Sequence, residues 1–153
     1  ISTAGVVSKI EEFTKSKEKF KLAISLNGTT NEQRSSIMPI NIKNSLDELL
    51  NVARKYTETV NRWLTFEYVL LKEINDSVED AKRLLSMLAG MKKCKLNIIP
   101  YNETDGEFRR PDKDQIENFV IALRPAKFPI TVRWSKGTDI DAGCGQLATR
   151  NQV

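Results

Sequence analysis

The chain has no histidine and only two cysteines, Cys94 and Cys144, which lie far apart in the sequence. Without histidine it cannot form a serine–histidine or cysteine–histidine nucleophile pair, or a histidine-ligated metal site of its own. Two distant thiols are also too few for a disulfide scaffold, a four-cysteine zinc site or a complete iron–sulfur site. We therefore expect no metal ligands in this chain and a reducing, cytoplasmic setting.

Long apolar runs are missing as well. No segment approaches the roughly 18 apolar residues that a membrane span requires, and no signal-like segment opens the chain, so no membrane role is expected. The chain has 153 residues, of which 40% are hydrophobic and 29% charged, a composition typical of a globular protein. We interpret residues 1–153 as a single domain.

Positive charge is present in small excess and is unevenly placed. The net charge is +4, and residues 124–153 contain five basic but only two acidic side chains. A second basic cluster is formed by Lys92, Lys93 and Lys95. Clustered basic charge favours a polyanionic partner such as RNA, although an ordinary solvated surface explains so mild an excess equally well.

One segment near the C-terminus, residues 137–147, carries a thiol between two glycines. It reads Gly-Thr-Asp-Ile-Asp-Ala-Gly-Cys-Gly-Gln-Leu, with Cys144 as the cysteine. Glycines on both sides let backbone and thiol approach a bound partner closely, which is typical of a functional loop. A C-terminal turn with an incidental, buried thiol is the alternative that local sequence leaves open.

The rest of the chain alternates between strand and helix patterns. Apolar residues recur at helical spacing in residues 6–16, and capping residues start further helices after Thr30, Ser45, Asp76 or Ser77, and Pro111. Strand-like segments cover residues 20–26, 63–71, 94–99 and 130–134. This order predicts an α/β fold with right-handed βαβ units and a parallel sheet.

Parallel strands place their following loops at one edge of the sheet, where ligands usually bind. The segments after the four predicted strands are polar and include Cys144, which favours a site role for this thiol. Four or five strands cannot close an eight-stranded barrel, so we expect the first or last strand to be unpaired within the chain or to pair with another copy.

Three side chains within or beside the predicted strands need an explanation. Glu67 lies inside a strand that we interpret as continuously buried, so it needs a basic partner. Trp63 and Trp134 are predicted to pack in the core or barrel, with base stacking as a minor alternative.

Seven segments in order resemble the radical-SAM ribosomal RNA adenine methyltransferases of the RlmN/Cfr group. They are Ser-Thr-Ala-Gly-Val-Val at residues 2–7, Leu-Ala-Ile-Ser-Leu at 22–26, Met-Pro-Ile-Asn at 38–41, Thr-Phe-Glu-Tyr-Val-Leu at 65–70, Ile-Asn-Asp at 74–76, Cys-Lys-Leu-Asn-Ile-Ile-Pro-Tyr-Asn at 94–102, and residues 137–147. The resemblance covers essentially the whole chain, and the last segment is highly specific.

The resemblance implies the C-terminal part of a partial (βα) radical-SAM barrel that binds S-adenosylmethionine and a 4Fe-4S cluster. The family methylates an sp² carbon of adenine, carbon 2 in 23S rRNA and in some members transfer RNA, by a radical mechanism. In the family, the cysteine matching Cys144 is first methylated, a 5′-deoxyadenosyl radical then removes hydrogen from its methyl group, and the carbon radical attacks the base. Positions matching the cofactor contacts are Ser2, Ser25, Leu26, Asn27 and Asn102.

Several positions depart from the family pattern. Asn27 stands where histidine is usual, Gly143 replaces alanine, Ser135-Lys136 replaces Thr-Arg, and residues 102–110 lack a proline-rich form. The family's cluster cysteines, resolving cysteine and catalytic glutamate belong to an N-terminal half that we expect to be absent, since the chain starts abruptly at Ile1.

The resemblance therefore predicts a catalytic-domain fragment that is inactive alone. Its implied partners are 23S rRNA, possible transfer RNA, an electron-donor protein, and another copy at an exposed barrel edge. The alternatives are a non-catalytic RNA-binding module and a carbon-8-specific methyltransferase of the same family. A thiol redox protein is disfavoured because no resolving cysteine lies near Cys144.

Overall fold

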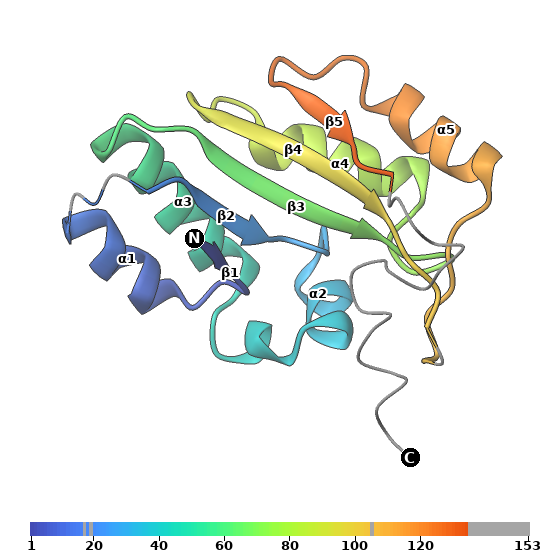
Figure 1. The fold of residues 1–153 in the computed structure, drawn as a ribbon, viewed down its shortest axis with the longest axis horizontal. Helices are drawn as coiled ribbons and strands as arrows, with labels where there is room; N and C mark the ends of the chain where they lie inside the picture. The colour runs from blue at the N-terminus through green and yellow to red at the C-terminus, as the bar shows by residue number, and fades with distance from the viewer. Residues whose placement is uncertain (17, 19, 105, 135–153) are drawn as a thin grey trace.

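A single sheet of five parallel strands organises the protein. The structure is a computed structural model that describes residues 1–16, 18, 20–104 and 106–134. The strands are β1 (Ser2–Thr3), β2 (Leu22–Ser25), β3 (Leu64–Leu70), β4 (Cys94–Pro100) and β5 (Ile130–Val132), and they lie side by side in chain order (Figure 1). The sequence prediction of an α/β fold with a parallel sheet is confirmed.

Helices connect successive strands, and most begin with the side-chain caps that the sequence predicts. They are α1 (Val7–Ser16), α2 (Asn31–Ile37), the 3-10 turn η1 (Pro39–Ile42), α3 (Leu46–Thr59), α4 (Val78–Leu88) and α5 (Lys113–Ala122). Reciprocal capping boxes start α3 at Ser45, α4 at Ser77 and α5 at Asp112. Each box satisfies two backbone N–H groups that the first turn would otherwise leave free.

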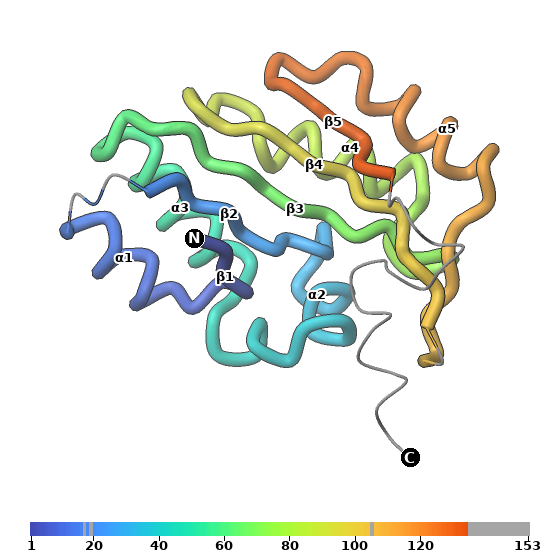
Figure 2. The backbone as a smooth tube through the Cα atoms, viewed as in Figure 1, coloured from blue at the N-terminus to red at the C-terminus, as the bar shows by residue number. Residues whose placement is uncertain are grey.

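The helices cover one face of the sheet, and that face forms the core. Along β3, Leu64, Phe66, Tyr68 and Leu70 are fully buried against the helical layer. The view in Figure 2 looks onto the other face, with α3 and α4 lying behind the strands. Apolar side chains from β2, β4, α3, α4 and α5 complete this cluster.

The second face of the sheet is only half buried, which corrects one expectation. Burial alternates residue by residue along β3 and β4, so β3 is not continuously buried as we predicted. The intervening residues, including Glu67, lie on the face without helices. Trp63 and Trp134 are 46% and 54% exposed, so the prediction that they pack in a core is wrong for the described structure. Trp63 directly precedes β3, and Trp134 lies two residues after β5.

The sheet is open within the described residues. β1 pairs only with β2 and β5 only with β4, so the outer edge of each carries no strand from residues 1–16, 18, 20–104 or 106–134. This confirms the expectation of an unpaired edge strand.

None of the helices in that part of the chain has the length and apolar character needed to span a bilayer.

Candidate functional site

Four of the five predicted cofactor-contacting residues lie at or just after the carboxyl end of a strand. Ser2 lies in β1, Ser25 ends β2, and Leu26 and Asn27 follow β2 directly. Asn102 follows β4, so it belongs to the same edge. Because all strands are parallel, the four residues that end or follow β2 and β4 lie toward one edge of the sheet, whereas Ser2, paired with Ala23, opens β1. Cys144, the predicted methyl carrier, lies outside the described residues.

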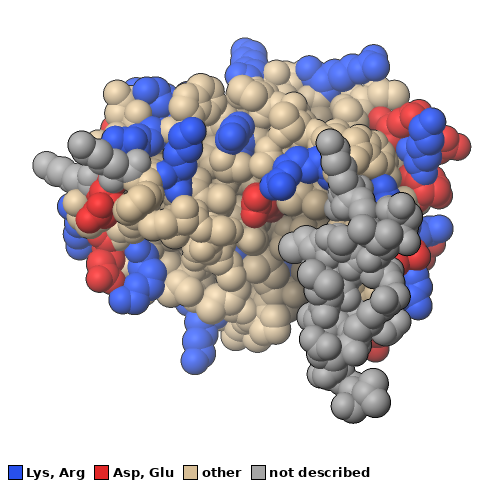
Figure 3. Space-filling view, in the orientation of Figure 1, with Lys and Arg blue, Asp and Glu red and all other residues tan. Residues whose placement is uncertain are grey.

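Polar side chains cross the open face of the sheet in a row through the middle of β3 and β4. Register pairs Ser25 with Glu67, Glu67 with Asn97, and Asn97 with Thr131 across four neighbouring strands. Thr131 donates its hydroxyl to the Asn97 amide oxygen. Figure 3 shows this face as a largely uncharged surface, with basic side chains spread along its upper border. A parallel sheet is usually covered on both faces, so this polar row is a surface suited to a polar ligand or a further layer.

Glu67 has the basic partner that its position in a strand requires. Its Oε1 lies 3.7 Å from Nη1 of Arg133, which follows β5 on the same open face. The Arg133 side chain is 64% exposed, so the pair contributes little to stability. The expectation of a carboxylate neutralised by a basic neighbour is confirmed.

Asn102 has a buried hydrogen-bonding atom that the described protein leaves free. The residue is only 5% exposed, and its Oδ1 has no hydrogen-bond partner within the described part of the chain. Buried amide oxygens are nearly always bonded, and leaving one unbonded costs roughly 1–3 kcal/mol. An orphaned acceptor at the carboxyl edge is therefore the kind of group that a bound ligand would satisfy.

Asn27 is locked into the backbone of the neighbouring strand. Its φ of 55° places it in the left-handed region, which asparagine tolerates better than most residues. Its Oδ1 accepts a hydrogen bond from Val69 N at 2.9 Å, and its carbonyl accepts one from Asn75 Nδ2 at 3.0 Å. Asn75 also donates to Val69 O and accepts from Leu71 N. These bonds hold the segment after β2 against the end of β3.

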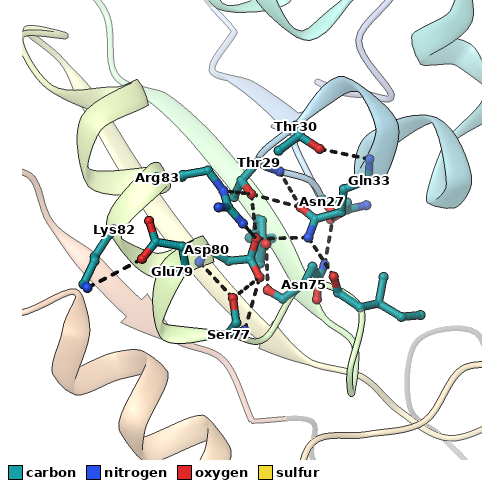
Figure 4. Close-up of polar contacts among 12 residues, drawn as sticks. Asn27, Thr29, Thr30, Gln33, Asn75, Ser77, Glu79, Asp80, Lys82 and Arg83 are labelled. Carbon is teal, nitrogen blue, oxygen red and sulfur yellow. Dashed lines mark hydrogen bonds and ion pairs between the residues drawn. The ribbon is translucent and has the colours of Figure 1, made fainter.

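A second polar cluster ties α2 to α4 beneath the same segment (Figure 4). Asp80 lies at its centre. Its Oδ1 accepts hydrogen bonds from Thr29 Oγ1 at 2.7 Å and from Gln33 Nε2 at 3.0 Å. The same oxygen forms an ion pair with Arg83 at 2.7 Å. The other oxygen caps the helix at Ser77. Thr30 caps α2 by accepting a hydrogen bond from Gln33 N, as the sequence predicts, and the Gln33 side chain accepts one from Thr29 N.

The charge state of Asp80 follows from these contacts. Burial pushes its pKa upward, but the hydrogen bonds from Ser77, Thr29, Gln33 and Arg83 outweigh burial, so the pKa lies below its usual value. Asp80 is thus an ionised structural anchor. The Cys94 thiol, by contrast, is buried with its pKa raised by burial to about 11, which makes it a poor nucleophile.

Sequence reasoning missed three of the residues that shape this edge: Arg34, Asn75 and Asp80. Asn75 stood in a quoted motif, but its bond to the Asn27 carbonyl joins residues 48 positions apart in the sequence. Asp80 carried a usable signal, because Ser77-x-x-Asp80 has capping-box spacing.

Known proteins with similar sequences match nearly the whole chain. A probable dual-specificity RNA methyltransferase RlmN from Pseudothermotoga lettingae is 42% identical over 151 residues, covering 99% of this chain and 44% of that protein. The dual-specificity RNA methyltransferase RlmN 2 from Myxococcus xanthus is 44% identical over 154 residues, covering 100% of this chain and 40% of that protein. No family model matches the chain.

Over nearly its whole length, the chain is similar to part of the RlmN methyltransferases. It spans less than half the length of the RlmN relatives that it matches. A solved radical SAM methyltransferase from Sphaerobacter thermophilus superposes with a TM-score of 0.89 at 40% identity, covering 95% of this chain and 42% of that one. A domain of pyruvate-formate lyase-activating enzyme from Bacteroides vulgatus has a TM-score of 0.67 at 14% identity, and it shows a shared fold only.

The two cofactors implied by the RlmN resemblance fit the chain differently. The orphaned Asn102 oxygen, just after β4, fits a ligand rich in hydrogen-bond donors such as S-adenosylmethionine. A 4Fe-4S cluster does not fit: within the described residues, no three cysteine, histidine or acidic side chains are grouped to hold a metal. Cluster ligands would have to come from outside this chain.

Proposed function

We propose that this chain supplies part of the catalytic barrel of an RNA methyltransferase that uses S-adenosylmethionine. The observation that carries the proposal is the 42% identity over 99% of the chain to a relative described as an RNA methyltransferase. The carboxyl edge of the sheet supports it, because the buried acceptor of Asn102 after β4 has no partner within the described residues.

In this proposal, each described residue has a limited task. Asn102 accepts a hydrogen bond from the cofactor, and Ser2 and Ser25 offer hydroxyl groups from neighbouring strands. Leu26 is fully buried, and its N–H and carbonyl already bond to Glu67 O and Arg34 Nε, so it shapes the wall. Asn27 acts through the fixed course of its backbone, because Val69 occupies its side-chain oxygen. When bound, S-adenosylmethionine supplies the methyl group.

The finer assignments are proposals from the resemblance. We infer that Cys144 carries the methyl group and that the acceptor is carbon 2 of adenine in 23S rRNA, with transfer RNA as a second substrate. Cluster ligands and an electron-donor protein come from outside this chain, and the cytoplasm is the expected compartment. The basic side chains near the edge, such as Arg109 and Arg110, suit contact with RNA phosphates.

Replacing Cys144 by alanine in the complete methyltransferase tests this proposal. We expect methyl transfer to RNA to vanish while RNA affinity stays within about twofold, since one thiol adds little to a phosphate-dominated interface. Cys94→Ala is the matched control, because this buried thiol has no proposed role and its variant should stay active. RNA binding without methylation by the unaltered protein would instead support a non-catalytic RNA-binding module.

A further inference from the structure

Arg34, on α2, is the largest fully buried side chain of the described structure. It is 0% exposed, and no carboxylate within the described residues lies within 4.0 Å of its guanidinium. Burying a charge without a counter-charge is costly unless hydrogen bonds compensate it. Burial accordingly lowers the pKa of Arg34. A cation buried without a counter-charge therefore indicates a specific role for its hydrogen bonds.

The hydrogen bonds of Arg34 show what the guanidinium does. Nε donates to Leu26 O at 2.9 Å, and Nη2 donates to Ala4 O at 2.7 Å and to Ser25 O at 3.2 Å. Ala4 directly follows β1, and Ser25 and Leu26 end and follow β2. One planar group therefore bonds the carboxyl ends of two neighbouring strands, and its fork geometry fixes their spacing.

The surroundings of Arg34 are built to hold it rigidly. Nη1 donates to Asn41 Oδ1 at 2.9 Å, and the Asn41 amide donates in turn to Asn31 and Ser35. A Cβ on Gly28 would lie 2.7 Å from Arg34 Cβ and 2.8 Å from its Cα and N. Such a contact with backbone cannot be relieved by a side-chain rotation, so the segment after β2 passes this close only because residue 28 is glycine.

A second glycine faces the other end of the same side chain. Gly5 has a φ of 102°, and a Cβ there would lie 2.9 Å from Arg34 Nη2. The turn after β1 therefore needs glycine both for its backbone conformation and for the space that the guanidinium occupies.

We propose that Arg34 is a positioning residue for the S-adenosylmethionine site, because it braces the carboxyl ends of β1, the strand that begins with Ser2, and of β2, whose end carries Ser25, Leu26 and Asn27. The inference rests on the proposed function for the identity of the ligand. The bracing itself rests only on bonds within the described chain. Arg34 touches no ligand in this proposal and acts through the strand ends.

The test compares Arg34→Lys with Leu88→Ala in the complete methyltransferase. Lysine keeps the charge but not the planar fork, so it cannot bond both strand ends in the same geometry. Leu88 is fully buried at the opposite end of α4, and its truncation lowers stability without touching the carboxyl edge. Binding of S-adenosylmethionine is measured by calorimetry, below the unfolding midpoint of every variant.

We expect Arg34→Lys to raise the dissociation constant for S-adenosylmethionine at least tenfold, and Leu88→Ala to leave it within twofold. Amide hydrogen exchange gives a second readout, and residues 22–29 should exchange at least tenfold faster in Arg34→Lys while residues 94–100 stay near the wild-type rate. Should lysine prevent folding, Arg34→Gln, which retains an amide donor, is measured in the same way.

Unchanged affinity and unchanged exchange in folded Arg34→Lys would overturn the inference. An equal loss of affinity in Leu88→Ala would do the same, since a general loss of stability would then explain the effect. A wild-type protein that binds no S-adenosylmethionine would instead contradict the proposed function, and the exchange of residues 22–29 would still decide whether Arg34 braces the strands.

Discussion

Two buried asparagines at the carboxyl edge differ in how their amides are used. Asn75 bonds Leu71 N, Asn27 O and Val69 O with distances of 2.7 to 3.0 Å, so the fold uses both ends of its amide. Asn102 keeps an acceptor without a partner in the described protein. The first amide stabilises the fold, whereas the second is available to a ligand.

This difference gives opposite expectations for the two alanine variants. Asn75→Ala should lose about 3 kcal/mol of unfolding free energy, because it leaves buried backbone groups unsatisfied. Asn102→Ala should lose less than about 1 kcal/mol, because no bond to its oxygen is broken. It should nevertheless weaken S-adenosylmethionine binding by about tenfold, the equivalent of one hydrogen bond of about 1.4 kcal/mol.

Urea unfolding and calorimetric titration of the complete methyltransferase measure the two quantities separately. Asn75→Ala serves as the control for a purely structural amide. If Asn102→Ala destabilised the fold as much as Asn75→Ala and bound the cofactor normally, the assignment of Asn102 to the site would be wrong.

At the scale of elements, the joint between α2 and α4 depends on the ionised Asp80. Its pKa is below the usual value in the folded protein, so its contribution to stability is fully present above the unfolded pKa of about 3.9. That contribution is lost as the pH falls through this range toward the folded pKa. We expect wild-type stability to drop steeply below about pH 4.

Asp80→Asn should remove the part of this pH dependence that Asp80 causes. At neutral pH the variant should be less stable by about 2–3 kcal/mol, because charge-assisted bonds to Arg83 and Thr29 are weakened. Urea unfolding from pH 3 to pH 7 measures both effects. Glu79→Gln is the control, since Glu79 pairs with Lys82 at 3.5 Å on an exposed surface and should change stability by less than about 0.5 kcal/mol. Parallel pH profiles for wild type and Asp80→Asn would contradict this account.

The elements themselves were predictable because their signals are local. Helical spacing of apolar residues and the caps at Ser45 and Ser77 located α3 and α4, and apolar segments located the strands. Burial along β3 was not predictable in the same way. Its alternation depends on which face the helices cover, and the segment of residues 63–71 is apolar enough to suit either arrangement.

The candidate site was predictable only where residues follow strands directly. Parallel topology alone brings Ser25 and Asn102 to one edge. Arg34 could not be found from the sequence, since an arginine in a short polar helix reads as a surface residue. It is buried because two glycines leave the space that it fills. Gly5 is distant from it in the sequence, and Gly28 lies in the loop before α2.

The whole sheet has an open edge at β1 whose hydrogen-bonding direction can be assigned. Ala23 N donates to Ile1 O at 2.8 Å, and the register pairs Ser2 with Ala23. In a parallel pair, the residues on either side of Ser2 therefore bond to β2, and the N–H and carbonyl of Ser2 point outward. An unpaired edge of this kind is a template for another strand.

We therefore expect the 153-residue chain, taken by itself, to self-associate through the outer edge of β1. Ser2→Pro should raise the dissociation constant for self-association about tenfold, because proline removes the outward N–H and is tolerated on an edge strand. Ser2→Ala is the matched control, since it keeps that N–H and should associate like the wild type. Light scattering after size-exclusion chromatography, over a range of concentrations, measures the effect. If both variants associated equally, the contact would not lie at β1. A selective loss of self-association in Ser2→Pro would identify this edge as the place where the molecule accepts a further strand.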